Sequence, residues 1–261
     1  MNRIFTALLF FTFSIYAEDL EGITTPSADV SASFTTQALI TELKVKEGEF
    51  VKKGQLLAVQ EREAQQNELI RLNKEASAMA LIDKAKIEIE FFKKDFASLS
   101  EAMKKGATSQ KEINDVELAL KTAELALQEA KFNKEVATLK VKELKSRLKQ
   151  FELRTPVDGI IEKLSIDTGE APRPGEEHIR IVSIDPMWVE IPVPRNIAMK
   201  LKNGASATVT FTNAKISRVG QIIFISPVAD TASDTVRVKV ELTNPNKRLV
   251  GERVLVDFKV K

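Results

Sequence analysis

Cysteine is absent from all 261 residues, which excludes disulfide bonds and also lipidation through an N-terminal thiol. Histidine occurs once, at His178 in the polar segment "GEEHIR", where we expect it at the surface. Neither a Gly-x-Ser-x-Gly elbow nor a phosphate-binding loop is present. The five methionines are scattered along the chain, so ligands for soft metal ions are scarce. We therefore expect a protein that is not an enzyme and that holds neither a cofactor nor a metal ion.

An excess of one charge is also lacking, because 39 basic and 37 acidic residues leave a formal net charge of +2. Proteins that bind nucleic acid usually gather basic residues on one face, so we expect no nucleic-acid partner. The apolar run from Ile4 to Phe13 is shorter than the about 20 residues that a membrane-spanning helix needs. With Arg3 before it and Ala17 after it, the run is typical of a secretory signal peptide at 1–17. An uncleaved, membrane-anchoring start is the alternative.

Glycine and proline nearly vanish from residues 62–152, which contain Gly106 and no proline. Apolar residues from Ile113 to Phe151 recur in alternating steps of three and four, with Lys134 as the one polar member. The same alternation runs through an upstream set: Ile82, Ala85, Ile89, Phe92, Phe96, Leu99 and Met103. A sustained heptad pattern of this kind predicts a coiled-coil seam.

The start of the upstream seam is irregular. Leu69, Leu72, Ala76 and Met79 lead into it through consecutive three-residue steps, which predict a local overwinding of the seam. Met79 and Met103 fall on seam positions, so we expect both in the core. Lys134 either sets the register of the seam or extends its amino group outward to water.

The segment "MKKGATSQKEIND" separates the two seams. Gly106 can end the first helix in a left-handed cap, and Ser109 with Glu112 forms a capping-box pattern at the start of the second. Two seams of similar length joined by one tight turn predict an antiparallel hairpin, with helices of about 40 residues and roughly 60 Å. Two long parallel helices in a dimer are the alternative.

The segments on either side of 62–152 show the pattern of short strands and turns. Residues 37–61 and 153–185 carry the same seven-residue turn, "GEFVKKG" at 48–54 and "GEAPRPG" at 169–175. Each segment alone is too small to bury a core, so we expect the two to pair about a pseudo-twofold axis into one small flattened barrel. Two more ranges complete the chain: an extended lead-in at 18–36, and a small barrel or sandwich of short strands at 186–261.

The two turn-bearing segments resemble a known domain. "LKVKEGEFVKKGQLLAVQE" and "RTPVDGIIEKLSIDTGEAPRPG" are similar to the two halves of a biotinyl/lipoyl-type domain. Carrier proteins of that superfamily present a modified lysine on a turn that follows the first half. Ala64 falls where that lysine would stand, and Lys52 and Lys53 lie in an earlier turn, so we expect no attached cofactor.

The order of the segments resembles the periplasmic adaptor (membrane fusion) proteins of tripartite efflux pumps. "RTPVDGII" is similar to the Ala-Pro-x-Asp-Gly segment of that family, and "MWVEIPVPRN" looks closest to the adaptors of resistance-nodulation-division pumps rather than ABC exporters. The resemblance implies an α+β fold in which a long antiparallel α-helical coiled-coil hairpin is inserted in a split lipoyl-like β-domain, followed by a small β-barrel.

The resemblance also implies a function and partners. The chain would bridge an inner-membrane transporter and an outer-membrane channel for export of small molecules, in the periplasm at the inner membrane, as a trimer or hexamer. The hairpin tip would contact the channel through these residues: Lys104, Lys105, Gly106, Ala107, Thr108 and Ser109. Of the family's Arg-x3-Leu-x6-Ser tip pattern, Ser109 matches, whereas Ser98 and Ala102 occupy the Arg and Leu places. The alternatives are a biotin or lipoyl carrier and a structural coiled-coil protein of the cell envelope.

Overall fold

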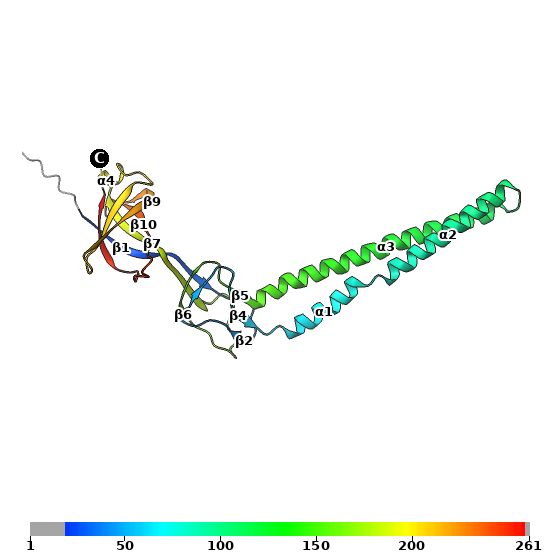
Figure 1. Cartoon of the computed structure of the whole chain (residues 1–261), viewed down its shortest axis with the longest axis horizontal. Helices are drawn as coiled ribbons and strands as arrows, with labels where there is room; N and C mark the ends of the chain where they lie inside the picture. Colours follow the sequence, from blue (N-terminus) through cyan, green and yellow to red (C-terminus); the bar gives the residue numbers. More distant parts are fainter. Residues whose placement is uncertain (1–18, 259–261) are drawn as a thin grey trace, which may run out of the picture.

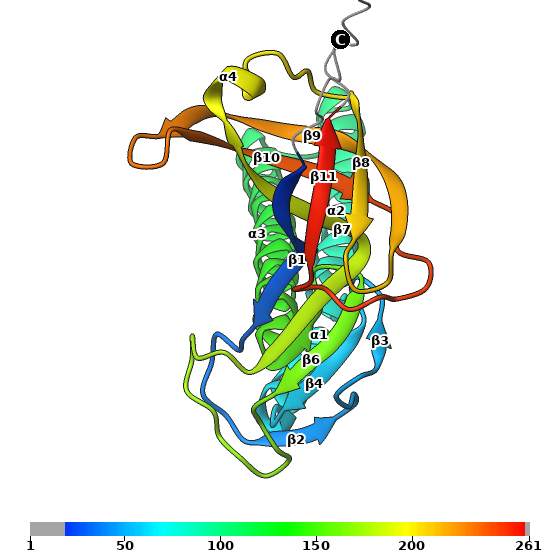
Figure 2. The same ribbon diagram turned by 90° about the vertical axis from the view of Figure 1, so that its left-hand side faces the viewer.

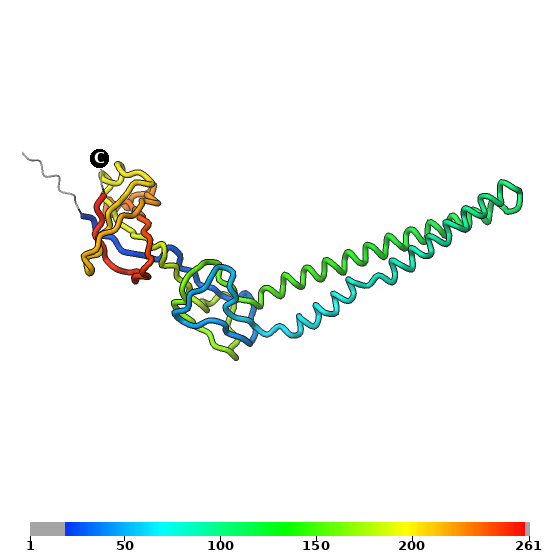
Figure 3. The backbone as a smooth tube through the Cα atoms, in the orientation of Figure 1, coloured from blue at the N-terminus to red at the C-terminus, as the bar shows by residue number. Residues whose placement is uncertain are grey.

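The computed structural model describes residues 19–258 of the chain. The molecule is elongated, with its strands gathered at one end and a long helical hairpin extending from them (Figure 1 and Figure 3). None of the helices within the described range is both long and apolar enough to cross a membrane. The predicted signal peptide at 1–17 lies outside the described residues.

Helices and strands occupy separate stretches of the chain. The helices are α1 Glu63–Ser77, α2 Ala80–Lys104, α3 Gln110–Leu148, the 3-10 helix Lys149–Phe151 and the short α4 Arg195–Ala198. The strands are β1 Leu20–Ala32, β2 Ile40–Leu43, β3 Phe50–Val51, β4 Leu56–Gln60, β5 Glu152–Arg154, β6 Gly159–Leu164, β7 Ile179–Pro194, β8 Ser206–Phe211, β9 Ile216–Asp230, β10 Thr235–Leu242 and β11 Arg253–Phe258. This arrangement confirms the α+β fold with an inserted helical hairpin that the sequence predicts.

Six strands close into an antiparallel barrel in the order β1-β11-β8-β9-β10-β7, and β7 pairs back onto β1. Alternate residues of a strand point to opposite faces, so Val189, Ile191 and Val193 of β7 are buried in the barrel core. Gly22 of β1 allows a close approach, because a Cβ there would lie 2.8 Å from a side-chain carbon of Val189. Figure 2 looks onto this barrel with the hairpin behind it.

Strands β1 and β7 continue past the barrel as a two-stranded ribbon into a second β-domain, where Ala32 pairs with Ile179. The segment expected as an extended lead-in therefore contains a strand that both domains share. Arg180 and Asp29 bridge the ribbon through two hydrogen bonds of 2.9 and 2.7 Å. These bonds to the Arg180 guanidinium lower the pKa of the Asp29 carboxyl.

The second, lipoyl-like domain joins chain segments from before and after the hairpin through its twin turns. The N–H of Gly48 donates to the carbonyl oxygen of Ile161 at 2.8 Å, and the N–H of Ile161 donates to that of Glu49 at 3.0 Å. The second turn makes the matching bonds. The N–H of Gly169 donates to the carbonyl oxygen of Ile40 at 2.9 Å, and the N–H of Ile40 donates to that of Glu170 at 2.7 Å. Both isoleucines are buried in the core of this domain. The two halves thus exchange the same hydrogen bonds, as a pseudo-twofold axis requires.

The hairpin pairs α3 with both α1 and α2. Each seam position that the heptad pattern assigns to α3 is buried or half-buried, including Lys134, and most positions between them are exposed. The alternating three- and four-residue spacing therefore predicts correctly which face of α3 packs against its partner helices.

The first helix of the hairpin differs from expectation. Instead of one overwound helix of about 40 residues, the chain forms α1 and α2 with an interruption at Ala78, whose backbone is extended (φ −65°, ψ 125°). Met79 is 38% exposed rather than buried in the core, and Met103 is half-buried. The apolar pattern changes phase at this point, and the chain accommodates the change with a break in the helix instead of overwinding.

Candidate functional site: the hairpin tip

The hairpin tip begins with a two-bond cap on the end of α2. The N–H of Ala107 donates to the carbonyl oxygen of Ala102 at 2.9 Å, and the N–H of Gly106 donates to that of Met103 at 2.9 Å. This pair of bonds is the Schellman motif, in which the residue after the C-cap adopts a left-handed conformation. Gly106 has φ 71°, a region that a side chain makes costly. The cap predicted for Gly106 is therefore present.

The second half of the tip is the capping box at the start of α3. The N–H of Glu112 donates to Oγ of Ser109 at 3.4 Å, and the N–H of Ser109 donates to Oε2 of Glu112 at 2.8 Å. The hydroxyl of Thr108 also donates to Oε2 of Glu112. The backbone N–H of Ser109, followed by the two hydroxyls, lowers the pKa of the Glu112 carboxyl. The tip is thus a turn held by hydrogen bonds at both ends.

All six residues predicted to contact the channel lie in this one turn, and Thr108 alone among them is half-buried while the rest are exposed. Lys104 forms an ion pair of 3.5 Å with Glu101. Ser98, in the place of the family's arginine, donates its hydroxyl to the carbonyl oxygen of Lys94 at 3.0 Å. The tip therefore presents small residues and lysines, and the contact with a channel remains a prediction.

The position of the carrier lysine is occupied by the hairpin. Ala64 lies in the first turn of α1, so no exposed β-turn exists there to present a modified side chain. Lys52 and Lys53 are exposed in the earlier turn, where the N–H of Lys53 donates to Oδ1 of Asp158 at 2.7 Å. The local geometry favours solvent-exposed turn lysines at both positions.

His178 is buried, contrary to the surface position expected from its polar neighbours. Its exposed fraction is 2%, and its ring centroid lies 5.9 Å from that of Phe34. Its backbone accepts from Ser165 at 2.8 Å and donates to Ala32 at 3.3 Å, so the residue sits where the ribbon enters the lipoyl-like core. Burial lowers the pKa of His178, and the nearby Glu176 carboxylate opposes this effect. Ile179 and Ile181 are the buried residues in the alternation of β7, so His178 is out of phase with that alternation, and the strand pattern does not signal its burial.

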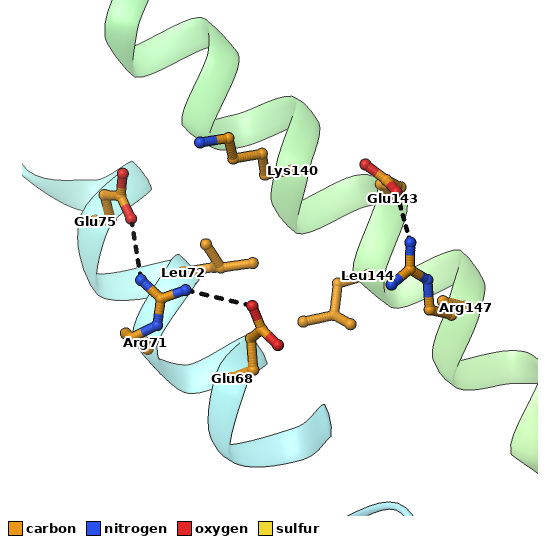
Figure 4. Close-up of a pocket in the computed structure, with 8 residues that line it drawn as sticks. All are labelled: Glu68, Arg71, Leu72, Glu75, Lys140, Glu143, Leu144 and Arg147. Atoms are coloured by element: carbon orange, nitrogen blue, oxygen red, sulfur yellow. Dashed lines mark hydrogen bonds and ion pairs between the residues drawn. The ribbon is translucent and has the colours of Figure 1, made fainter. Parts of the chain in front are cut away.

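A charged cleft of about 380 Å³ separates α1 from α3 near the base of the hairpin. Figure 4 shows its lining: Glu68, Arg71, Leu72, Glu75, Lys140, Glu143, Leu144 and Arg147. Arg71 pairs with Glu68 at 3.3 Å and with Glu75 at 3.6 Å, and Arg147 pairs with Glu143 at 2.9 Å. The lining carries three acidic and three basic side chains, so its charges balance across the two helices, which gives a charged ligand little to recognise. No cluster of three metal-ligating side chains occurs among residues 19–258.

The comparisons with known proteins agree with this architecture. Residues 186–255 match the family model of the CusB-like β-barrel domain. The cobalt-zinc-cadmium resistance protein CzcB of Cupriavidus metallidurans is 23% identical over 201 residues, which is 76% of this chain, and the chain spans 36% of that protein's length.

Solved structures share the fold over nearly the whole chain. MacA from Actinobacillus actinomycetemcomitans is similar with a TM-score of 0.79 at 22% identity, over 94% of this chain and 78% of that one. The membrane fusion protein Spr0693 from Streptococcus pneumoniae R6 has a TM-score of 0.61 at 15% identity, over 94% of this chain and 99% of that one. Residues 186–255 thus match the CusB-like β-barrel family, and the chain as a whole shares the fold of MacA and of the membrane fusion protein Spr0693.

Proposed function

We propose that the chain is the non-enzymatic periplasmic adaptor of a tripartite efflux system, linking an inner-membrane transporter to an outer-membrane channel. The observation that carries this proposal is the separation of two exposed ends. The hairpin tip and the β-barrel lie at opposite ends of the molecule (Figure 1), and α3 alone has 39 residues, or about 60 Å at 1.5 Å per residue. A structural link needs length and two docking ends rather than an active site.

The two ends suggest an orientation. The tip offers small residues that let another helix approach closely, which suits the channel. The barrel exposes Met199 and Val228, at 81% and 73%, beside a groove of about 520 Å³ between α4 and β9. Exposed apolar surface of this kind marks interaction sites, and we assign it to the transporter side. The proposed location that goes with this orientation is the periplasm, at the inner membrane.

Self-association into trimers or hexamers is part of the proposal. The outer face of α3 carries one exposed apolar side chain per heptad: Leu118, Leu125, Phe132 and Leu139, at 68, 60, 63 and 56% exposure. At a comparable level of the hairpin, α2 exposes a second set: Leu81, Ile87 and Phe91. Side-by-side packing of hairpins would bury both sets between copies.

The exported compound is a further part of the proposal. The relative CzcB is named for cobalt, zinc and cadmium resistance, so we propose divalent metal cations as one candidate cargo beside organic small molecules. The CusB-like barrel favours a proton-driven transporter of the resistance-nodulation-division type over an ABC exporter. Growth of a deletion strain in zinc, cobalt or cadmium salts, compared with growth in dyes, separates the two kinds of cargo.

Replacing residues 63–151 by a short Gly-Ser linker tests the adaptor function directly. The two β-domains keep their strands, so we expect normal protein levels together with dye or cation accumulation equal to that of the gene deletion. Unchanged accumulation would exclude the adaptor function and favour a structural envelope protein. Intact-mass spectrometry tests the carrier alternative, because an added biotin or lipoyl mass on the purified chain would establish it.

A further inference from the structure

The apolar seam of the hairpin changes phase between α1 and α2. On α1 the seam residues are Leu69, Leu72 and Ala76, and they are buried or half-buried. Continuing their alternation through Met79 would next select Asp83, Lys86 and Glu90, which are polar and exposed or paired on the surface. The residues that actually face α3 are Ile82, Ala85 and Ile89, one position earlier. The seam is therefore one residue short at this point.

One residue corresponds to about 100° of rotation around a helix axis. A continuous helix would turn the apolar face of either α1 or α2 away from α3 by that angle. The chain instead leaves the helical conformation at Ala78 and begins α2 at Ala80. Neither Met79 nor Arg62, the residues that precede α2 and α1, caps its helix through a side chain. The joint between α1 and α2 thus has no side-chain cap at the start of α2, whereas at the start of α1 the N–H of Glu63 donates to Oε1 of Glu61 at 2.8 Å.

The contact between α1 and α3 is small. Its buried members are Leu72, Val141 and Leu144, with Leu69, Ala76 and Leu148 packed against them. The charged cleft lies between the two helices beside these side chains (Figure 4). Figure 1 shows α1 diverging from α3 toward the β-domain, whereas α2 stays close to α3 up to the tip. Elements with few buried apolar contacts open at the lowest free-energy cost.

We propose that α1 is a hinged brace, which docks on α3 and releases from it at its two ends while α2 and α3 stay paired. With α1 docked, two supports join the outer hairpin to the lipoyl-like domain. With α1 released, α3 and the following 3-10 helix are the one remaining support, and the outer hairpin gains freedom of direction. The phase change in the seam is the sequence feature that creates the joint.

Pairs of spin labels on the full chain test the proposal, and the absence of cysteine makes the labelling selective. One pair, Asn73→Cys with Lys145→Cys, spans α1 and α3. The reference pair, Lys93→Cys with Lys121→Cys, spans α2 and α3. All four positions are exposed. We expect the distance distribution across α1 and α3 to be at least twice as wide as the reference, and α1 amides to exchange hydrogen at least tenfold faster than those of α2.

Inserting one alanine between Met79 and Ala80 restores the alternating three- and four-residue spacing through the joint. We expect this variant to fuse α1 with α2 and to narrow the α1–α3 distribution to the width of the reference. The matched control is one alanine inserted between Ala107 and Thr108 at the tip, outside both seams, which leaves the wide distribution unchanged. Leu72→Ala provides an independent variant, because removing a buried contact of α1 widens the distribution further and speeds exchange in α1.

Two results overturn the proposal. One is a wild-type distribution across α1 and α3 as narrow as the reference, with equal exchange rates in α1 and α2. The other is a distribution that stays wide in the Met79–Ala80 insertion variant although circular dichroism shows full helix content. If the insertion variant does not fold, the wild-type protein and Leu72→Ala decide the question. An α1–α3 distance distribution of equal width in the wild type and in Leu72→Ala contradicts a releasable brace.

Discussion

The side-chain amide of Gln60 donates a hydrogen bond to the carbonyl oxygen of Thr36 at 3.0 Å, and the hydroxyl of Thr36 donates back to Oε1 of Gln60 at 2.9 Å. Gln60 is fully buried and also donates to the carbonyl oxygen of Ala38 at 3.2 Å. It is the last residue of β4, three positions before the hairpin begins. One polar side chain therefore fastens the segment after β1 to the base of the hairpin.

Replacing Gln60 by methionine removes these bonds and leaves the carbonyl groups of the half-buried Thr36 and Ala38 without this donor. We expect a loss of about 1–3 kcal/mol in the stability of the lipoyl-like domain. Hydrogen exchange at the Ile40 amide measures this loss of stability within the one domain. Unfolding of the whole chain is less suitable, because a protein of several domains does not unfold in a two-state process. Gln128→Met on the exposed face of α3 is the control and should change little. Equal exchange in the two variants would show that the Gln60 bonds contribute nothing measurable.

The burial of His178 predicts a pH dependence. Its Nε2 has no hydrogen-bond partner, and burial lowers its pKa in the folded chain. The histidine of the unfolded chain then binds a proton more readily than that of the folded chain. The lipoyl-like domain is therefore most stable above about pH 6.5, the usual pKa of a histidine. It loses stability as the pH falls below that value. Denaturation at pH 7.5 and 5.5 measures the loss. His178→Leu should flatten this slope, and a slope that persists in the variant would assign it to other groups.

The left-handed conformation of Gly106 makes the tip sensitive to substitution. A Cβ at this position would meet no atom within 4 Å, so the backbone conformation alone sets the cost. We expect Gly106→Val to destabilise the last turn of α2 by at least about 1–2 kcal/mol. Gly106→Asn is the matched control, because asparagine tolerates this conformation. Amide exchange at Ala107 reports the difference, and similar protection in both variants would contradict the cap.

Ser109 combines a structural role with the predicted channel contact. Ser109→Ala removes the N-cap oxygen and should weaken the start of α3 by about 1 kcal/mol. Ser109→Asp keeps a capping oxygen and should retain most of that stability. Cross-linking of the tip to the outer-membrane channel then separates the two roles. Weaker cross-linking in both variants indicates direct contact, and normal cross-linking in both removes Ser109 from the contact.

The exposed stripe on α3 predicts how copies associate. Leu125→Glu combined with Phe132→Glu places two carboxylates on that face and should abolish trimers or hexamers in analytical ultracentrifugation. Leu125→Met combined with Phe132→Leu keeps the face apolar and should leave association intact. Helix content by circular dichroism should match in both proteins, because these side chains are exposed in the single chain. Oligomers that survive the glutamate pair would rule out association through this stripe.

The helical part of the fold follows largely from the sequence. The seam on α3, the cap at Gly106 and the capping box at Ser109 each depend on residues within a few positions of one another, and each is present in the structure. The step from Met79 to Ile82 also signals an irregularity. The form of this irregularity could not be deduced from the sequence, because overwinding and a break can both accommodate a phase change in the seam. Which of the two occurs depends on how α1 packs against α3.

The chain by itself determined the apolar seam of its hairpin helices, the left-handed turn at Gly106 and the capping box at Ser109, because local spacing and backbone conformation decide these features. The tertiary structure alone decided which distant segments meet. The turns at Gly48 and Gly169 exchange hydrogen bonds with Ile161 and Ile40 across the whole inserted hairpin. His178 is buried next to Phe34, which comes from the segment before the hairpin. Pairing between segments more than 100 residues apart decides which of these residues are buried. A pattern of a few neighbouring residues does not contain information on such pairing.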